Sequence, residues 1–287
     1  MTPRFLHVPI FLTLVGLAGA ADATPPKLAI VISVDQLRAD YLVRFRPYFG
    51  EGGFKRLLEG GTEFRNAHFR HAITQTAPGH AQMLSGVFAD VHGIIGNEWV
   101  DRTSWEQVNS VEDRDSPLVG IAPAELGPVQ AKAPEKTGRS PKNFLAVTVG
   151  DQLKERDGAK AKVFTASNKD RSAILLGGQR GDAAYWDENG RFVTSRHYRA
   201  ALPAWVAAFN AEKRAEAVFG KTWERLLPAE VYERVQGPDD AAGETVDFGV
   251  ADIQSQEITS STRSDSLYLR ARRGKSNVIR RLGTRPS

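Results

Sequence analysis

Three observations in the sequence predict an α/β fold with a parallel β-sheet. Residues 27–34 and 162–166 are apolar runs with many β-branched side chains, the composition of buried parallel strands. Polar residues that could bind a ligand follow each run directly. Because ligands bind outside the carboxyl ends of the strands in open α/β sheets, these polar residues mark a candidate site.

The first 23 residues have the features of a signal peptide. Arg4 supplies a positive end, 5–17 is largely apolar, and small residues at 18–20 or 21–23 offer a cleavage site. The apolar run is short for a membrane span, and an uncleaved anchor is the alternative. No later segment is long and apolar enough to cross a bilayer. We therefore expect a periplasmic or secreted protein without a stable membrane span, its mature chain starting near Thr24.

Asp35 follows the first predicted strand, 27–34. A carboxylate at that strand end suits a cation such as Zn²⁺. The alternative is that Asp35 caps a helix over 36–45. Further along, we expect a helix over 52–61 that ends in glycine and a short strand over 62–69.

Thr76 directly precedes Ala-Pro-Gly and a short helical pattern over 78–85. Proline is favoured in the first turn of a helix, so Thr76 is expected at a helix N-terminus. Free N–H groups there favour negative charge, and a hydroxyl in that place can act as a nucleophile. The alternative is an ordinary threonine N-cap. Asn97, in a glycine-containing turn, could donate its amide to a phosphoryl oxygen or simply satisfy its own turn.

Residues 112–139 are rich in proline, glycine and charge, which predicts a surface loop. An amphipathic helix is expected to start with Ser140 as its N-cap and to use Phe144, Val147, Val149 and Leu153 as its apolar face.

Lys169 and Arg171 follow the second predicted strand, 162–166. Two cations at a strand end suit an anionic group, because arginine presents a planar fork to two oxygens and lysine a point charge. The alternative is a solvated charged turn in which these cations pair with Asp170.

The last predicted elements are a strand, a hairpin and a helix. Residues 173–178 are expected to form a third strand, and 185–195 a β-hairpin that turns at Glu-Asn-Gly. A helix over 202–210 follows, with Trp205, Val206 and Phe209 directed into the core.

Composition limits the chemistry. The chain has no cysteine, so any metal must be bound by Asp, Glu, His or hydroxyl oxygens. Residues 251–287 carry a net charge of +5 and 24–250 a net charge of −1, so the overall +4 comes from the tail. The nearly neutral body does not indicate a nucleic-acid partner. The tail lacks an apolar period, so we expect it to be disordered or the product of a frameshifted reading frame.

Four of these motifs together resemble the alkaline phosphatase superfamily. The resemblance is greatest to bacterial secreted alkaline phosphatases with a threonine nucleophile, which are related to the nucleotide pyrophosphatase/phosphodiesterases. Asp35 and Thr76 are 41 residues apart, and Thr76 and Asn97 are 21 apart, which fits that family. The resemblance extends from about 27 to about 249 and rests on the motifs at 31–38, 76–80, 92–97 and 167–171.

The resemblance implies an alkaline-phosphatase-like α/β domain over 24–250 and a site with two Zn²⁺ ions. Asp35 and Thr76 would bind one zinc, and Thr76 would attack a small phosphate-ester substrate to form a phosphothreonine. Asn97, Lys169 and Arg171 would bind the phosphoryl group. The two cations favour a phosphate monoester, because its terminal phosphate carries more charge than a diester.

The same resemblance implies that the domain is incomplete at its C-terminus. The family completes its zinc sites with further Asp and His residues, yet no histidine lies beyond His197. Asp35 and Thr76 are too few ligands for a tight zinc site. We therefore expect this chain by itself to be unstable, with little or no metal-dependent activity. The alternatives are a phosphodiesterase or nucleotide pyrophosphatase, and a non-catalytic phosphate-binding remnant.

Overall fold

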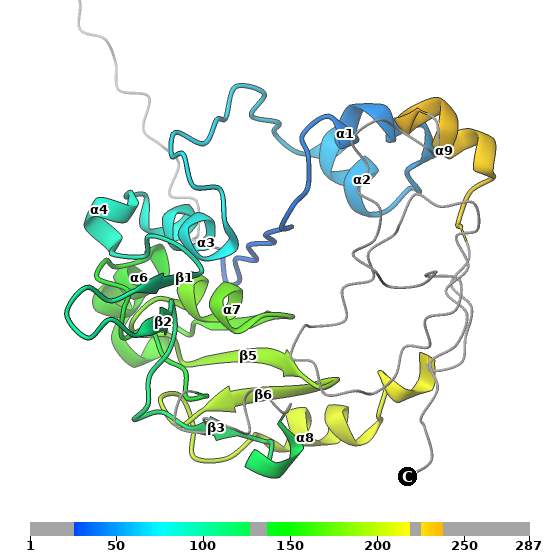
Figure 1. Ribbon diagram of the computed structural model, residues 1–287. Helices are drawn as coiled ribbons and strands as arrows, with labels where there is room; N and C mark the ends of the chain where they lie inside the picture. Colours follow the sequence, from blue (N-terminus) through cyan, green and yellow to red (C-terminus); the bar gives the residue numbers. More distant parts are fainter. Residues whose placement is uncertain (1–25, 127–136, 219–224, 238–287) are drawn as a thin grey trace, which may run out of the picture. The chain divides into compact units, whose positions relative to one another are not determined.

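A computed structural model describes residues 26–126, 137–218 and 225–237 (Figure 1). The chain divides into two compact units, Met1–Arg38 and Ala39–Ser287. The predicted signal peptide over 1–23 and the basic tail over 251–287 lie outside the described residues. In the part of the chain that is described, no helix has the length and apolar character needed to cross a membrane.

The second unit holds all of the described helices and strands. In chain order they are α1 (Tyr41–Arg44), η1 (Arg46–Tyr48), α2 (Gly53–Gly60), α3 (Thr76–Ser85), α4 (Ala89–His92), β1 (Glu98–Val100), β2 (Gln107–Asn109), β3 (Leu118–Val119), η2 (Pro123–Glu125), α6 (Val149–Asp157), η4 (Gly158–Lys160), β4 (Phe164–Ser167), α7 (Asp170–Gly177), β5 (Ala183–Glu188), β6 (Arg191–Ser195), α8 (Ala204–Ala211), η5 (Glu216–Val218) and α9 (Ala229–Gln236).

The main sheet has the strand order β3-β6-β5-β4 (Figure 1). The pair β4–β5 is parallel, with Phe164 opposite Ala183, and helix α7 makes the crossover between the two strands. The pairs β5–β6 and β6–β3 are antiparallel, so the sheet is mixed. A second, two-stranded antiparallel sheet consists of β1 and β2. The α/β fold class is confirmed, and its parallel part is the β4–α7–β5 unit.

The predicted hairpin is confirmed as β5 and β6. Its turn residues Asn189 and Gly190 have φ values of 54° and 79°. Both values lie in the left-handed region, which two-residue hairpin turns require and which asparagine and glycine tolerate best. The strand at 162–166 is also confirmed, as β4, one to two residues further along the chain.

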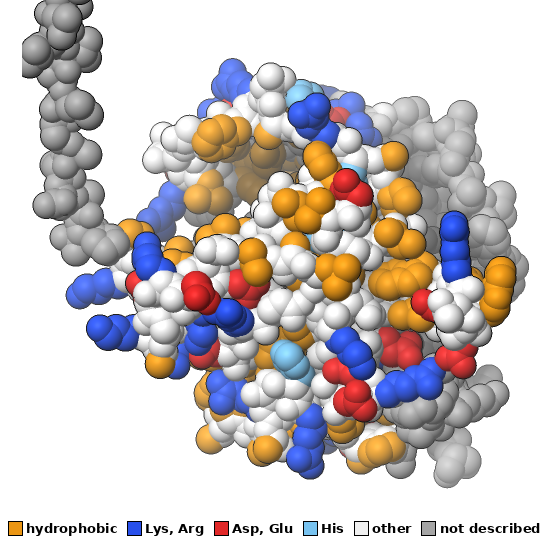
Figure 2. Space-filling view, turned by 90° about the vertical axis from the view of Figure 1, so that its left-hand side faces the viewer, with side chains coloured by type: hydrophobic (Ala, Val, Ile, Leu, Met, Phe, Trp, Pro, Cys, Tyr) orange, Lys and Arg blue, Asp and Glu red, His pale blue; other side chains and the backbone are white. Residues whose placement is uncertain are grey.

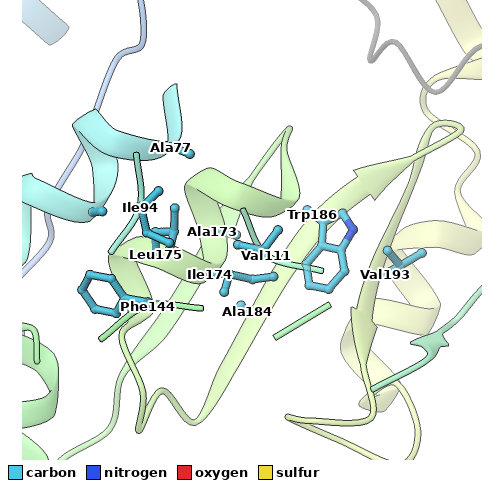
Figure 3. Packing of buried hydrophobic residues seen from close by; sticks show 11 residues of the cluster. Ala77, Ile94, Val111, Phe144, Ala173, Ile174, Leu175, Ala184, Trp186 and Val193 are labelled. Carbon is cyan, nitrogen blue, oxygen red and sulfur yellow. The ribbon is translucent and has the colours of Figure 1, made fainter. Parts of the chain in front are cut away.

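Strand β5 buries both of its faces. Ala184 and Trp186 belong to a large apolar cluster with residues of α3 and α7, and Ala183 and Tyr185 pack with Val206 of α8. Since successive side chains of a strand point to opposite faces, α7 and α8 cover opposite faces of the sheet. Figure 3 shows the first of these clusters, in which labelled side chains of α7 and β5 point toward one another.

The prediction of a strand over 173–178 is wrong, because these residues lie in helix α7 and its C-cap. Ala173, Ile174 and Leu175 are all buried between α3 and the sheet. A short run of apolar residues is typical both of a buried strand and of a helix buried on most sides, so the run alone does not distinguish the two.

The N-terminal predictions are largely wrong. Residues 27–34 form no strand, and Leu28 and Ile32 are 75% and 76% exposed. Strands require a hydrogen-bonded neighbouring strand, and no described strand pairs with this run. The predicted strand over 62–69 consists of turns and extended chain. The helix over 52–61 is confirmed as α2.

The helix predicted over 36–45 is only α1, four residues long. Gln36 has a φ of 61°, which is incompatible with a right-handed helix at that position. Asp40 occupies the N-cap position of α1, so the reading of Asp35 as its cap is wrong.

The helix predicted from Ser140 starts later, at Val149. Ser140 donates its hydroxyl to Asp113 Oδ2 at 2.7 Å, so it does not cap a helix. Thr148 is the N-cap instead, and it exchanges hydrogen bonds with Asp151 in a capping box. Of the predicted apolar face, Phe144 is buried but precedes the helix, while Val149 is exposed.

Two further burial predictions need correction. The segment 112–139 is not simply a surface loop, because Asp113 and Ser116 are buried, although 127–136 lies outside the described residues. Helix α8 is confirmed, and its Val206 is buried, but Trp205 is 65% exposed and packs edge-on against Tyr185. Figure 2 shows exposed apolar side chains lying among charged ones on one face of the molecule.

We expect Leu175→Ala to lower the free energy of unfolding by about 2–5 kcal/mol, because it opens a cavity between α3, α7 and the sheet. The matched control is Leu57→Ala in α2, where the side chain is 64% exposed and the change should stay within about 0.5 kcal/mol. Urea unfolding of the full chain measures both. Equal losses would show that the cluster of Figure 3 is not the main core.

Candidate functional site

Thr76 is the first residue of α3, a ten-residue helix. Gln75, with extended backbone, is its N-cap, and Gly86 ends it with a φ of 71°. The predicted placement of Thr76 at a helix N-terminus is therefore confirmed, and its interpretation as the N-cap is wrong. Thr76 therefore lies in the first turn of a helix, where the helix dipole favours an anion.

Burial of the first turns holds α3 in place. Ala77, Pro78, His80 and Ala81 are buried, and Ala77 and Ala81 contact the main apolar cluster. His80 Nδ1 lies 2.7 Å from the carbonyl oxygen of Thr76, one turn earlier. This contact within α3 helps to fix the backbone that carries the Thr76 hydroxyl.

Asn97 is joined to the start of α3 by two hydrogen bonds. The backbone N–H of Ala77 donates to Asn97 Oδ1 at 2.9 Å, and the backbone N–H of Asn97 donates to Gln75 Oε1 at 2.8 Å. The Asn97 side chain therefore does not satisfy its own turn, which was the alternative interpretation. Because Oδ1 accepts from Ala77, the Nδ2 group is the donor that the side chain can direct to an anion. The structure thus brings Thr76 and Asn97 together.

The loop between α4 and Asn97 is fixed by His92. This side chain is 1% exposed, and its Nδ1 accepts the backbone N–H of Ile94 at 3.1 Å. Burial lowers the pKa of His92, outweighing its backbone hydrogen bond and the nearby Asp90, so the neutral ring is favoured. Gly96 comes close to Gln75 and Glu98, where an added Cβ would lie 3.0 Å from the Glu98 carbonyl oxygen.

Lys169 and Arg171 lie at the start of α7, directly after β4. Lys169 is the N-cap residue, and Arg171 is in the first turn with its side chain 17% exposed. Arg171 Nε is buried and has no hydrogen-bond partner among the described residues. The pair therefore lies at the carboxyl end of a parallel strand, as predicted, and also at the N-terminus of a helix, which was not predicted.

Asp170, between these two cations, is paired with a third. Its Oδ2 accepts Arg139 Nε at 2.6 Å, and its Oδ1 lies 3.8 Å from Arg171 Nε. Burial would raise the pKa of Asp170, but the charges of Arg139 and Arg171 outweigh burial and hold it below its usual range. The alternative of a solvated turn in which Asp170 pairs with these cations is right about the pairing, but Asp170 itself is buried and its shortest contact is with Arg139.

Sequence reasoning missed Arg139. It falls at the end of 112–139, the segment predicted to be a surface loop, and no periodic pattern distinguishes it from the other charged residues there. In the structure its side chain is 11% exposed. Arg139 is therefore identified only in the folded chain, by its contact with Asp170, 31 residues later.

Helices α3 and α7, which begin at these two groups of residues, pack against each other. Ala77 and Ala81 of α3 lie in the same cluster as Ala173 and Ile174 of α7 (Figure 3). The small side chains of α3 allow the helices to approach closely. One apolar core therefore supports both the hydroxyl residue and the cationic pair.

Asp35, the remaining predicted site residue, belongs to the first unit, where it is exposed in a turn. The described residues contain no group of three or more His, Cys, Asp or Glu side chains that could hold a metal ion. Because zinc sites use three or four ligands, the described residues do not by themselves fit the predicted zinc site.

Residues 29–251 match the protein family described as type I phosphodiesterase / nucleotide pyrophosphatase. The alkaline phosphatase PhoV of Synechococcus elongatus is 40% identical over 209 residues, and the alkaline phosphatase PafA of Elizabethkingia meningoseptica is 36% identical over 222 residues. A crystal structure of PafA with substitutions of a threonine, an asparagine, a lysine and an arginine aligns with a TM-score of 0.63 at 35% identity.

These matches cover most of this chain but a smaller part of the relatives. The alignment takes in 72% of this chain and 36% of PhoV, and 76% of this chain and 39% of PafA. The PafA structure is matched over 69% of this chain and 37% of its own. The chain therefore spans less than two fifths of the length of these relatives.

The buried neutral His92 makes stability depend on pH. As pH falls below about 6.5, the unfolded chain binds a proton that the folded chain resists, so we expect the free energy of unfolding to fall. Partial desolvation also lowers the pKa of His197, but this side chain is exposed to solvent, so its contribution to the pH dependence should be smaller. In His92→Asn, whose side-chain oxygen can replace Nδ1, the loss between pH 7 and 5 should be smaller. An identical loss in both chains, measured by urea unfolding, would contradict the assignment.

Proposed function

Because this chain belongs to the type I phosphodiesterase / nucleotide pyrophosphatase family, we propose that it supplies the nucleophile and the anion-binding residues of a phosphate-monoester hydrolase. The observation that carries the proposal is the joined pair of Thr76 and Asn97. A hydroxyl residue opens a ten-residue helix, and an asparagine is hydrogen-bonded to that same first turn. This is an arrangement suited to phosphoryl binding and attack.

The substituted PafA supports the choice of residues. Its altered threonine and asparagine are 21 positions apart, and its altered lysine and arginine are two apart. Thr76 and Asn97 are 21 positions apart here, and Lys169 and Arg171 are two apart. Residue types and spacings agree for all four positions, which is the basis for giving the four residues roles in a single site.

The proposed reaction has two displacements at phosphorus. Thr76 Oγ attacks the phosphorus and the bond to the leaving oxygen breaks, so the phosphoryl group is transferred to Thr76 and an alcohol departs. Water then attacks the phosphothreonine, which releases inorganic phosphate and restores the hydroxyl. Asn97 Nδ2 donates to a non-bridging oxygen, and Lys169 and Arg171 balance the charge of the terminal dianion.

We propose zinc as the metal of this enzyme class. A zinc ion bound beside Thr76 would lower the pKa of its hydroxyl. Asp35 and Thr76 are the candidate ligands from this chain, and they are fewer than zinc requires. Metal analysis of the purified chain tests this point: about two zinc ions per chain would support an assembled site, and none would favour a non-catalytic phosphate-binding protein.

We expect Thr76→Ala to lower turnover of an aryl phosphate by at least about 10³-fold, because the attacking oxygen is lost. The assay uses the zinc-supplemented full chain, alone and fused to the part of PhoV that it does not match. Thr76→Ser, which keeps a hydroxyl, should retain measurable turnover and form a phosphoserine detectable by mass spectrometry. Full turnover in the alanine variant would overturn the proposed nucleophile.

The second candidate is a diesterase, which the description of the family favours. The double variant Lys169→Ala/Arg171→Ala separates the two, because a monoester carries the greater charge to be balanced. We expect it to lower turnover of an aryl phosphate by about 10²-fold or more, and turnover of the matching diester by less. Equal losses for the two substrates would remove the argument for a monoester.

A further inference from the structure

We propose that Arg139 is a positioning residue for Arg171: by pairing with Asp170, it keeps the Arg171 guanidinium available to an anion instead of to Asp170. The proposal rests on the proposed function in one respect only, the assignment of Arg171 to the phosphoryl group. It adds a role for a buried cation on a segment far from α7 in the sequence.

The contacts of Asp170 are divided between its two oxygens. Oδ2 accepts Arg139 Nε at 2.6 Å. Oδ1 accepts the backbone N–H of Arg171 at 2.7 Å and lies 3.8 Å from Arg171 Nε, beyond hydrogen-bond distance. The carboxylate is therefore close to two guanidinium groups, and it forms a side-chain hydrogen bond with Arg139.

Because Asp170 is buried, it matters which of the two arginines pairs with it. The side chains of Arg139 and Asp170 are each 11% exposed, so solvent screens little of the charge of Asp170. A buried carboxylate without Arg139 would still have Arg171 Nε close by, about 1 Å beyond the length of a charge-assisted hydrogen bond. A small rotation of the Arg171 side chain would close that gap. The guanidinium would then be held by Asp170 and lost to the substrate.

Hydrogen bonds to the backbone hold the segment that carries Arg139 in this position. Its backbone N–H donates to the Ser116 carbonyl at 2.9 Å, and the neighbouring Gly138 carbonyl accepts the N–H of Asp113 at 2.9 Å. Asp113 Oδ2 in turn accepts the hydroxyls of Ser116 and Ser140, each at 2.7 Å. An added Cβ on Gly138 would lie 2.1 Å from the Asp113 carbonyl oxygen, so the two segments are in direct backbone contact.

The side-chain Nε–H signals of the full chain, labelled with ¹⁵N-arginine, test the proposal by NMR. In Arg139→Met we expect the Arg171 Nε–H signal to move downfield and its exchange with water to slow about tenfold, because Arg171 now bonds to Asp170. Inorganic phosphate, titrated in parallel, should bind about tenfold more weakly. In Arg139→Met/Asp170→Asn, where the carboxylate is removed, the Arg171 signal and phosphate binding should return toward those of the unaltered chain.

Two controls separate positioning from general support of the fold. Arg139→Lys keeps a cation beside Asp170 and should preserve the Arg171 signal. Lys142→Met removes a cation that pairs with Asp113 and Asp115 rather than with Asp170, so it should leave that signal unchanged. If Arg139→Met fails to fold, Arg139→Gln takes its place, with a smaller shift in the same direction.

The outcomes are distinct. An Arg171 signal that does not change in a folded Arg139→Met or Arg139→Gln chain overturns the positioning role. A double variant that still binds phosphate as weakly as Arg139→Met also overturns it, since Arg139 would then contact the anion itself. If the unaltered chain does not bind phosphate, the proposed function fails, while the NMR comparison still decides whether Arg139 controls Arg171.

Discussion

Burial of both faces of strand β5 is the constraint on which the rest of the described structure depends. Ala184 and Trp186 must be covered on one side, and Ala183 and Tyr185 on the other. Helix α7 covers the first face because the crossover from β4 to β5 brings it there, and α8 covers the second. Helix α3 then packs on α7, so one apolar core supports both the helix that begins at Thr76 and the helix that follows Lys169.

Some of the contacts that hold the candidate site have a local sequence signal, and others do not. The position of Thr76 is predictable because Pro78 and Gly86 mark the two ends of its helix locally. The hairpin was found for the same reason, since Asn189 and Gly190 fit only a few backbone shapes. The turn that contains Asn97 predicts a polar donor, but its hydrogen bond with Ala77 joins positions 20 residues apart and has no local signature.

The errors have a common physical cause, which is that burial and partners are properties of the folded chain. The apolar run at 27–34 has the composition of a core strand, yet no described strand supplies its hydrogen bonds. Residues 173–175 are equally apolar and became a helix because α3 and the sheet enclose them. Ser140 has the residue type of a cap, but Asp113 takes its hydroxyl. The charged residues of 112–139 favour a solvent-exposed loop, whereas Arg139 pairs with Asp170 where both side chains are largely buried.

The close backbone approach of Gly138 to Asp113 has a consequence for how this protein tolerates change. A methyl group at Gly138 would push apart two chain segments that contact each other through their main-chain atoms. The shift would also displace the next residue, Arg139, whose guanidinium pairs with Asp170. In a scan of substitutions, Gly138 would then be among the positions where replacement is tolerated least, although glycine has no side-chain functional group.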